Sequence, residues 1–151
     1  WHIQCNMAPE QLVAMEKLLL SLPVPVIIDH LGRAVDTSGP QYVAVRRLLD
    51  SGHGWVKVSG AYLYGKGKAP DYADSSAAAM GYIRHAPERC VWGSDWPHPD
   101  ATSGRVPMPD DAVLINLLAV WAPDEKLRHR ILVENPETFY GFDPAKRPKA
   151  I

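Results

Sequence analysis

The chain has 151 residues, 46% of them hydrophobic and 22% charged, and its formal net charge is -1. Because acidic and basic residues are nearly balanced and mixed along the chain, the sequence lacks the basic patch that binding to nucleic acid or to an anionic membrane requires. The apolar runs are far shorter than a membrane span and no signal peptide is visible, so we expect a cytoplasmic protein. Cys5 and Cys90 lie in apolar runs outside any motif, and we expect both to be free, buried thiols.

Short apolar runs alternate with segments of helical periodicity in the first part of the chain. Residues 1–5 form the first run, and the second run, at 25–30, follows a helix predicted at 9–22. That helix begins at a proline, which suits the first turn, and ends where two further prolines forbid its continuation. A helix predicted at 40–50 leads to the third run, at 55–60. The apolar face predicted for the first helix consists of Leu12, Met15, Leu19 and Leu22.

The second part of the chain has one more apolar run, at 90–92, and mostly helical patterns. The helices predicted here span 72–85, 109–121, 123–133 and 135–141. Four strands separated by helices imply a parallel sheet, because a short hairpin cannot join parallel neighbours, so the predicted fold class is α/β. We expect one domain over residues 1–142 and an extended surface tail over 143–151.

The most informative motif is residues 90–99, whose sequence is CVWGSDWPHP. The predicted strand stops there at a turn of small residues that carries Asp95 and His98. A carboxylate at the end of a buried strand, followed within one loop by an imidazole, is what a hydrolytic site needs to activate water. The alternative interpretation is structural: Asp95 caps a turn and His98 is a solvated loop residue. On balance the motif favours an enzyme.

Polar side chains within or at the end of the predicted strands favour one of two ways of closing the sheet. They are His2, Gln4, His30, Ser59 and Asp95. An eight-stranded barrel gathers such side chains over a single mouth. An open, doubly wound sheet that binds nucleotides uses a glycine-rich phosphate loop, which this sequence lacks. We therefore predict part of a barrel.

Four motifs occur in order along the chain, at 26–32, 56–60, 92–99 and 134–142. Together they resemble the amidohydrolase-related TIM-barrel hydrolases, and within that group the pyrone-dicarboxylate and sugar-acid lactonases. The resemblance covers residues 1–142. Since such a barrel takes roughly 250 residues, the resemblance implies the C-terminal half of a TIM barrel, with about four βα units. The open sheet edges of a half-barrel imply a partner, either the N-terminal half-barrel or a second copy of the chain.

The resemblance also implies a hydrolase that opens the lactone of a small carboxylic acid. Asp95 is then the general base that takes a proton from water, while His30 and His98 donate hydrogen bonds to the oxyanion or protonate the departing oxygen. Leu63 stands where related lactonases often place an arginine, which argues against a dicarboxylate substrate. The expected substrate-binding residues are His2, Gln4, Arg33, Ser59 and Tyr62.

We expect no cofactor and no metal ligand in this chain. Metal-dependent members of the superfamily carry a His-x-His pair on their first strand, and the nearest match here, at residues 2–4, has glutamine at its second position. A divalent metal such as zinc would enter only with such a pair in the N-terminal half of a full protein. Two alternatives stay open: a metal-dependent hydrolase or decarboxylase of the same fold, and a non-catalytic half-barrel fragment that binds a partner.

Overall fold

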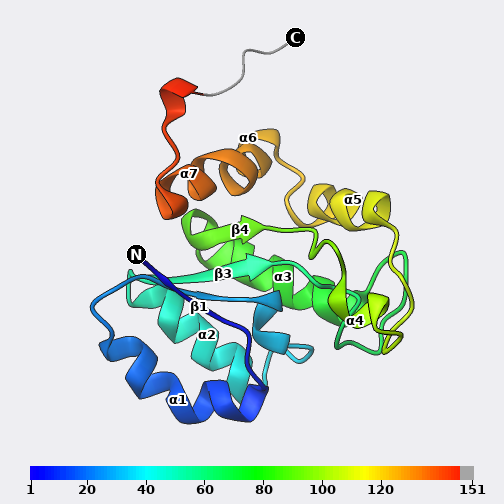
Figure 1. The fold of residues 1–151 in the computed structure, drawn as a ribbon, viewed down its shortest axis with the longest axis horizontal. Helices are drawn as coiled ribbons and strands as arrows, with labels where there is room; N and C mark the ends of the chain where they lie inside the picture. The colour runs from blue at the N-terminus through cyan, green and yellow to red at the C-terminus, as the bar shows by residue number, and fades with distance from the viewer. Residues whose placement is uncertain (147–151) are drawn as a thin grey trace.

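The structure, a computed structural model that describes residues 1–146, contains one sheet of four parallel strands (Figure 1). The strands lie side by side in chain order: β1 (Ile3–Cys5), β2 (Val26–Ile28), β3 (Gly54–Val58) and β4 (Cys90–Trp92). Each neighbouring pair is parallel. The four predicted strands and the α/β class are therefore confirmed.

One face of the sheet packs against helices. The helices on this face include α1 (Pro9–Ser21), α2 (Pro40–Asp50) and α3 (Ala73–His85), and Figure 1 shows α1 and α2 lying along the sheet. Both α1 and α2 begin at a proline, whose missing N–H costs no hydrogen bond in the first turn. Each of the three helices contributes fully buried side chains to the core, among them Leu12, Val45 and Tyr82.

The other face of the sheet has an apolar and a polar part. The apolar part is a small buried cluster of Ile27, Trp55 and Val91, against which the partly buried Phe139 packs. Because side chains alternate between the two faces of a strand, the residues two positions further along lie on this same face. They are Asp29, Lys57 and Gly93. This polar part lies toward the carboxyl ends of the strands and positions the candidate site.

The helices predicted after residue 108 are present as α5 (Asp111–Trp121), α6 (Glu125–His129) and α7 (Asn135–Tyr140). Two of them are capped by aspartates, because the carboxylates of Asp110 and Asp124 each accept a hydrogen bond from a backbone N–H in the first turn. These caps explain why α5 and α6 begin where the acidic residues stand in the sequence.

Several local features differ from the sequence-based prediction. The single helix predicted at 123–133 is α6 followed by a π-helical turn at Arg130–Glu134. His30–Arg33 forms a short 3-10 segment and Pro99–Thr102 forms the short helix α4, and both are too short to show a hydrophobic period. Met15, which was predicted to be buried, is 38% exposed, because the buried stripe of α1 is narrower than its apolar pattern.

The tail predicted to be extended, at 143–151, lies partly outside the described residues. Within them, Pro144–Lys146 forms a 3-10 turn, whereas 147–151 lie outside. No helix in residues 1–146 is long and apolar enough to cross a membrane. In this described part of the chain, β1 and β4 each have one neighbouring strand, so the partner expected for the sheet edges stays a prediction.

Candidate functional site

A polar pocket of about 330 Å³ opens where the strands end. Because the carboxyl ends of parallel strands meet at one edge of a sheet, residues distant in the sequence come together there. Four of the predicted site residues lie in its lining: Gln4, His30, Ser59 and Asp95. The remaining lining residues are Asp29, Lys57, Gly93, Ser94 and Trp96.

His30 lies between Ser59 and Asp95. Its Nδ1 atom is 3.0 Å from Ser59 Oγ, and its Nε2 atom is 3.5 Å from Asp95 Oδ1. Burial lowers the pKa of His30, although the negative charges of Asp95 and Asp29 act in the opposite direction. We therefore assign a neutral imidazole near pH 7, in which Nδ1 accepts from the Ser59 hydroxyl and Nε2 carries the hydrogen.

Tyr62 holds the other oxygen of Asp95. Its hydroxyl donates a hydrogen bond to Asp95 Oδ2 over 2.7 Å. Burial raises the pKa of Tyr62, and the hydrogen bond to Asp95 raises it further. The phenol therefore stays protonated and serves Asp95 as a donor. Oδ1 of Asp95 is left for His30 and for the pocket.

Three site residues have backbone dihedrals that residues other than glycine rarely adopt. The angle φ is +50° at His30, +67° at Asp95 and +57° at His98. Such conformations cost roughly 1–3 kcal/mol each, and in proteins they cluster at functional sites. Their occurrence at these three residues supports the choice of this region as the candidate functional site.

His98 lies behind Asp95 and does not line the pocket. Its Nδ1 atom is 3.3 Å from the Tyr62 hydroxyl, and its Nε2 atom is 3.1 Å from Asp111 Oδ1. The residue is only 3% exposed, and each of its ring nitrogens has a protein partner. Asp111 was not predicted as a site residue, because an acidic residue at the start of a helix is explained by the helix dipole alone.

Asp29 and Lys57 form a further polar cluster, and neither was predicted from the sequence. Lys57 Nζ lies 2.8 Å from Asp29 Oδ1, and the Gln4 amide donates to Asp29 Oδ2 over 2.8 Å. Gly93 leaves room for the lysine, since a Cβ there would lie 3.3 Å from Lys57 Cδ. The signal for Lys57 was present: it is a charged residue inside an otherwise apolar strand.

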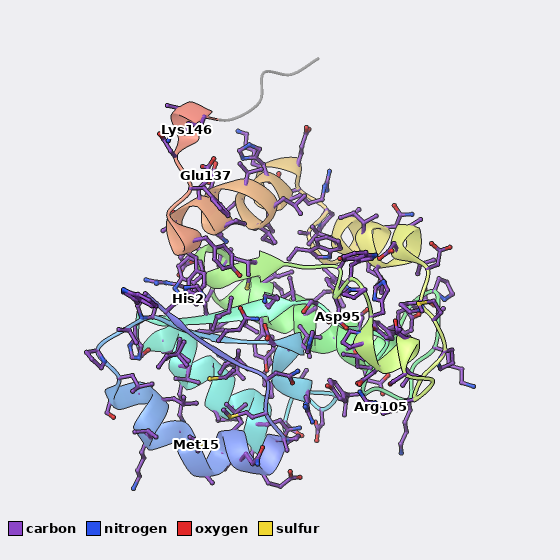
Figure 2. The ribbon with its side chains drawn as sticks, viewed as in Figure 1. His2, Met15, Asp95, Arg105, Glu137 and Lys146 are labelled. Atoms are coloured by element: carbon purple, nitrogen blue, oxygen red, sulfur yellow. The ribbon has the colours of Figure 1, made fainter. Side chains whose placement is uncertain are left out.

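Three of the predicted substrate-binding residues lie outside the pocket lining. His2 packs against two aromatic rings of α7, and Figure 2 shows it toward the opposite end of the sheet from Asp95. Arg33 donates a hydrogen bond to Asn6, and its guanidinium lies over the ring of Tyr64. Tyr62 is the third, and its hydroxyl contacts Asp95.

The described residues do not fit a metal ion by themselves. In residues 1–146 no three histidine, cysteine, aspartate or glutamate side chains are grouped so that they could hold one. Catalytic zinc sites use three protein ligands, whereas the pocket offers His30 and Asp95 as its available pair. The third candidate, Asp29, is already neutralised by the ammonium of Lys57. The side chains of this pocket therefore do not form a metal site on their own.

The family follows from comparison with known proteins. A family model described as amidohydrolase matches residues 1–142. The chain belongs to the amidohydrolase family. This result confirms the family that the four sequence motifs resemble.

Curated relatives of this amidohydrolase chain include enzymes named for lactones. It is 42% identical to D-galactarolactone isomerase of Agrobacterium fabrum over 123 residues, which is 80% of this chain and 41% of the isomerase. It is 38% identical to 4-sulfomuconolactone hydrolase of Rhizobium radiobacter over 144 residues, which is 93% of this chain and 48% of that enzyme. The chain thus spans about half the length of the curated relatives it matches.

Solved structures agree with this relationship. An Agrobacterium tumefaciens protein, crystallised in its apo form, superposes with a TM-score of 0.82 at 36% identity. The matched region is 95% of this amidohydrolase chain and 52% of the A. tumefaciens chain. A probable 2-pyrone-4,6-dicarboxylic acid hydrolase of Acinetobacter baumannii, with citric acid bound, gives a TM-score of 0.78 at 27% identity over 94% and 53%. The four βα units therefore correspond to about half of a TIM-barrel amidohydrolase, as predicted.

Proposed function

We propose that this amidohydrolase opens the lactone ring of a small carboxylic acid by hydrolysis. The observation that carries the proposal is the position of Asp95, whose carboxylate contacts both His30 and Tyr62 at the carboxyl edge of the sheet. The names of the relatives support the substrate class, because galactarolactone, sulfomuconolactone and 2-pyrone-4,6-dicarboxylate are all cyclic esters.

Asp95 acts as the general base. The hydrogen bond from Tyr62 holds Oδ2, so Oδ1 is the oxygen available to a water molecule in the pocket. The water gives a proton to this carboxylate while its lone pair forms a bond to the lactone carbonyl carbon. The π electrons of the carbonyl move to its oxygen, and a tetrahedral intermediate results.

His30 stabilises the negative charge that develops on that oxygen. Its Nδ1 atom accepts from Ser59, so the hydrogen on Nε2 faces Asp95 and the pocket. Because burial lowers the pKa of His30, the imidazole is neutral and donates a hydrogen bond instead of releasing a proton to Asp95. When the intermediate collapses, the ring C–O bond breaks and the departing oxygen takes the proton from Asp95.

The predicted substrate-binding residues contribute unequally to this proposal. Gln4 and Ser59 line the pocket, which supports a direct contact between each of them and the substrate. His2 and Arg33 make their contacts elsewhere in the structure, with aromatic rings and, for Arg33, also with Asn6. We therefore assign substrate contacts to Gln4 and Ser59 first.

Lactone isomerisation is a second candidate, because D-galactarolactone isomerase shares 42% identity with this chain. In that reaction a hydroxyl of the substrate, in place of water, attacks the carbonyl, and Asp95 takes the proton of that hydroxyl. Reaction in oxygen-18 water separates the two. Hydrolysis places one labelled oxygen in the product carboxylate, whereas direct isomerisation leaves the product unlabelled.

The test of the proposal is a hydrolysis assay with D-galactarolactone, 4-sulfomuconolactone and 2-pyrone-4,6-dicarboxylate. Asp95→Asn lowers kcat about 100-fold or more, because an amide cannot take the proton of water. The matched control is Asp100→Asn, which removes a nearby carboxylate that pairs with Arg105. This control stays close to wild type. Activity of Asp95→Asn equal to that of the control would disprove the mechanism.

Treatment with a chelator distinguishes the alternatives of the same fold. Hydrolysis that survives the chelator supports the metal-free route through Asp95. Activity lost with the chelator and restored by a divalent cation overturns that route in favour of a metal-dependent hydrolase. Release of carbon dioxide from a carboxylated substrate would identify a decarboxylase, and failure to turn over any lactone would overturn the proposal as a whole.

A further inference from the structure

We propose that Asp111, His98 and Tyr62 form a chain of hydrogen bonds that positions the carboxylate of Asp95 from the side away from the substrate. The inference rests on the proposed function, in which Asp95 is the general base. It extends that function by giving a part to Asp111, which lies outside the pocket. It also makes His98 and Tyr62 positioning residues, although the sequence suggested direct roles for both.

The first link fixes the orientation of the base. A carboxylate that turns freely about its last bond presents either oxygen to the pocket. The Tyr62 hydroxyl, 2.7 Å from Asp95 Oδ2, removes that freedom, so Oδ1 is directed toward His30 at 3.5 Å. Because burial and the hydrogen bond to Asp95 raise the pKa of Tyr62, the phenol keeps the hydrogen that it donates.

The second link holds Tyr62 in place. His98 Nδ1 lies 3.3 Å from the phenol oxygen, and the two rings meet edge to face with centroids 5.6 Å apart. The backbone adds a direct connection, since the His98 N–H donates to the Asp95 carbonyl over 2.6 Å. A displacement of His98 would therefore move Asp95 through the side chain of Tyr62 and through the turn itself.

The third link ends the chain at Asp111. Two aspartates stand at the start of α5, and Asp110 alone supplies the cap by accepting from the Ala112 N–H. The Asp111 carboxylate is thus not needed for capping, and its Oδ1 lies 3.1 Å from His98 Nε2. The positive end of the helix dipole favours a carboxylate at this place. With Nε2 and Nδ1 both engaged, His98 has no ring nitrogen left for a substrate.

Kinetics of conservative variants test this chain of hydrogen bonds. Tyr62→Phe removes only the hydroxyl and lowers kcat about 10- to 100-fold with little change in KM, because the base is misoriented while substrate contacts remain. Asp111→Ala lowers kcat less, and Asp111→Asn, which keeps an acceptor for His98 Nε2, recovers most of the loss. The matched control is Asp110→Asn, which removes the neighbouring charge and leaves the activity unchanged.

Two kinetic results would overturn the proposal. A raised KM with unchanged kcat in Tyr62→Phe would show that Tyr62 binds the substrate directly. Equal kcat values for Asp111→Ala and Asp110→Asn would show that the His98 contact of Asp111 has no effect on the reaction.

Nitrogen NMR of the His98 ring tests the same chain without any substrate. Both Tyr62→Phe and Asp111→Ala shift the ring signals of His98, whereas Asp110→Asn does not. Unchanged signals in the two variants overturn the chain, whatever the activity. If no lactone is turned over but the signals respond as expected, the chain of hydrogen bonds exists and the proposed function is the part that fails. The two failures are therefore distinguishable.

Discussion

At the scale of single residues, the site depends on the missing side chain of Gly60. A Cβ at this position would lie 2.8 Å from His30 Nδ1 and 2.7 Å from Leu63 Cδ1, closer than real Cβ contacts. Gly60→Ala therefore displaces His30 from its place beside Asp95. We expect kcat to fall about 10-fold or more, because a shift of about 1 Å at a reacting group costs up to about 100-fold. Steady-state kinetics with a lactone substrate measures this effect.

Gly52 provides the matched control for that prediction. Its φ of +82° resembles the +64° of Gly60, but nothing lies within 4 Å of a Cβ built there. Gly52→Ala thus carries a similar backbone strain, roughly 1 kcal/mol, without touching the site. Both variants melt at lower temperature, and only Gly60→Ala loses activity. Equal activities would mean that the space beside His30 is not what Gly60 supplies.

The same scale shows which site residues a sequence can reveal. Asp95, His30 and Ser59 were predictable because each follows an apolar strand closely, and the ends of parallel strands share one edge. The alternation of side chains along a strand puts His2 on the same face of the sheet as Gln4. It does not tell how far His2 lies from the carboxyl end of the strand, and in the structure His2 contacts α7.

The missed residues are those whose partners come from another element. The ion pair of Asp29 and Lys57 joins neighbouring strands, so it depends on the register between them. Asp111 meets His98 only because α5 packs beside the turn after β4. The charge of Lys57 inside an apolar strand is visible in the sequence, but its partner is not, and the helix dipole alone explains an aspartate at the start of a helix.

At the scale of elements, Asn135 ties the C-terminal helices to the sheet. Its side-chain amide donates to the carbonyl oxygens of Pro87 and Cys90 over 2.7 and 2.6 Å, and the residue is 5% exposed. Asn135→Ala leaves these carbonyls without that donor, so we expect the free energy of unfolding to fall by roughly 1–3 kcal/mol. Urea denaturation measures it. Asn116→Ala on the exposed side of α5 is the control, and an equal loss there would contradict the anchoring role.

The elements themselves were largely predictable because prolines mark their boundaries. Pro9 and Pro40 open α1 and α2, and Pro87 follows the end of α3. Pro136 likewise marks the start of α7, but a proline does not tell that the turn before it is π-helical. This turn is directly followed by Asn135, whose side chain donates to the Cys90 carbonyl at the start of β4, a tertiary contact that the local sequence does not announce.

At the scale of the whole molecule, the sheet separates stability from chemistry. One face is covered by helices and holds the main core, and the other face carries the polar side chains of the pocket. His30 takes part in both stability and chemistry. It lines the pocket, and its burial on folding lowers its pKa. The carboxylates of Asp95 and Asp29 oppose that shift, while the cations of Lys57 and Arg33 add to it. Folding therefore favours the neutral form of this histidine.

The stability of the molecule is consequently expected to depend on pH through His30. In the unfolded chain a histidine binds its proton near pH 6.5, whereas in the folded protein His30 binds it only at lower pH. Below about pH 6.5 the unfolded state thus holds more protons, and the free energy of unfolding falls as the pH decreases; above that pH this group adds no dependence.

Urea denaturation between about pH 7.5 and 5 measures how steeply the free energy of unfolding depends on pH. His30→Asn flattens this dependence, and His129→Asn, which removes an exposed histidine, leaves it unchanged. Parallel pH profiles for wild type and His30→Asn would mean that the burial of His30 does not govern the acid sensitivity of the fold.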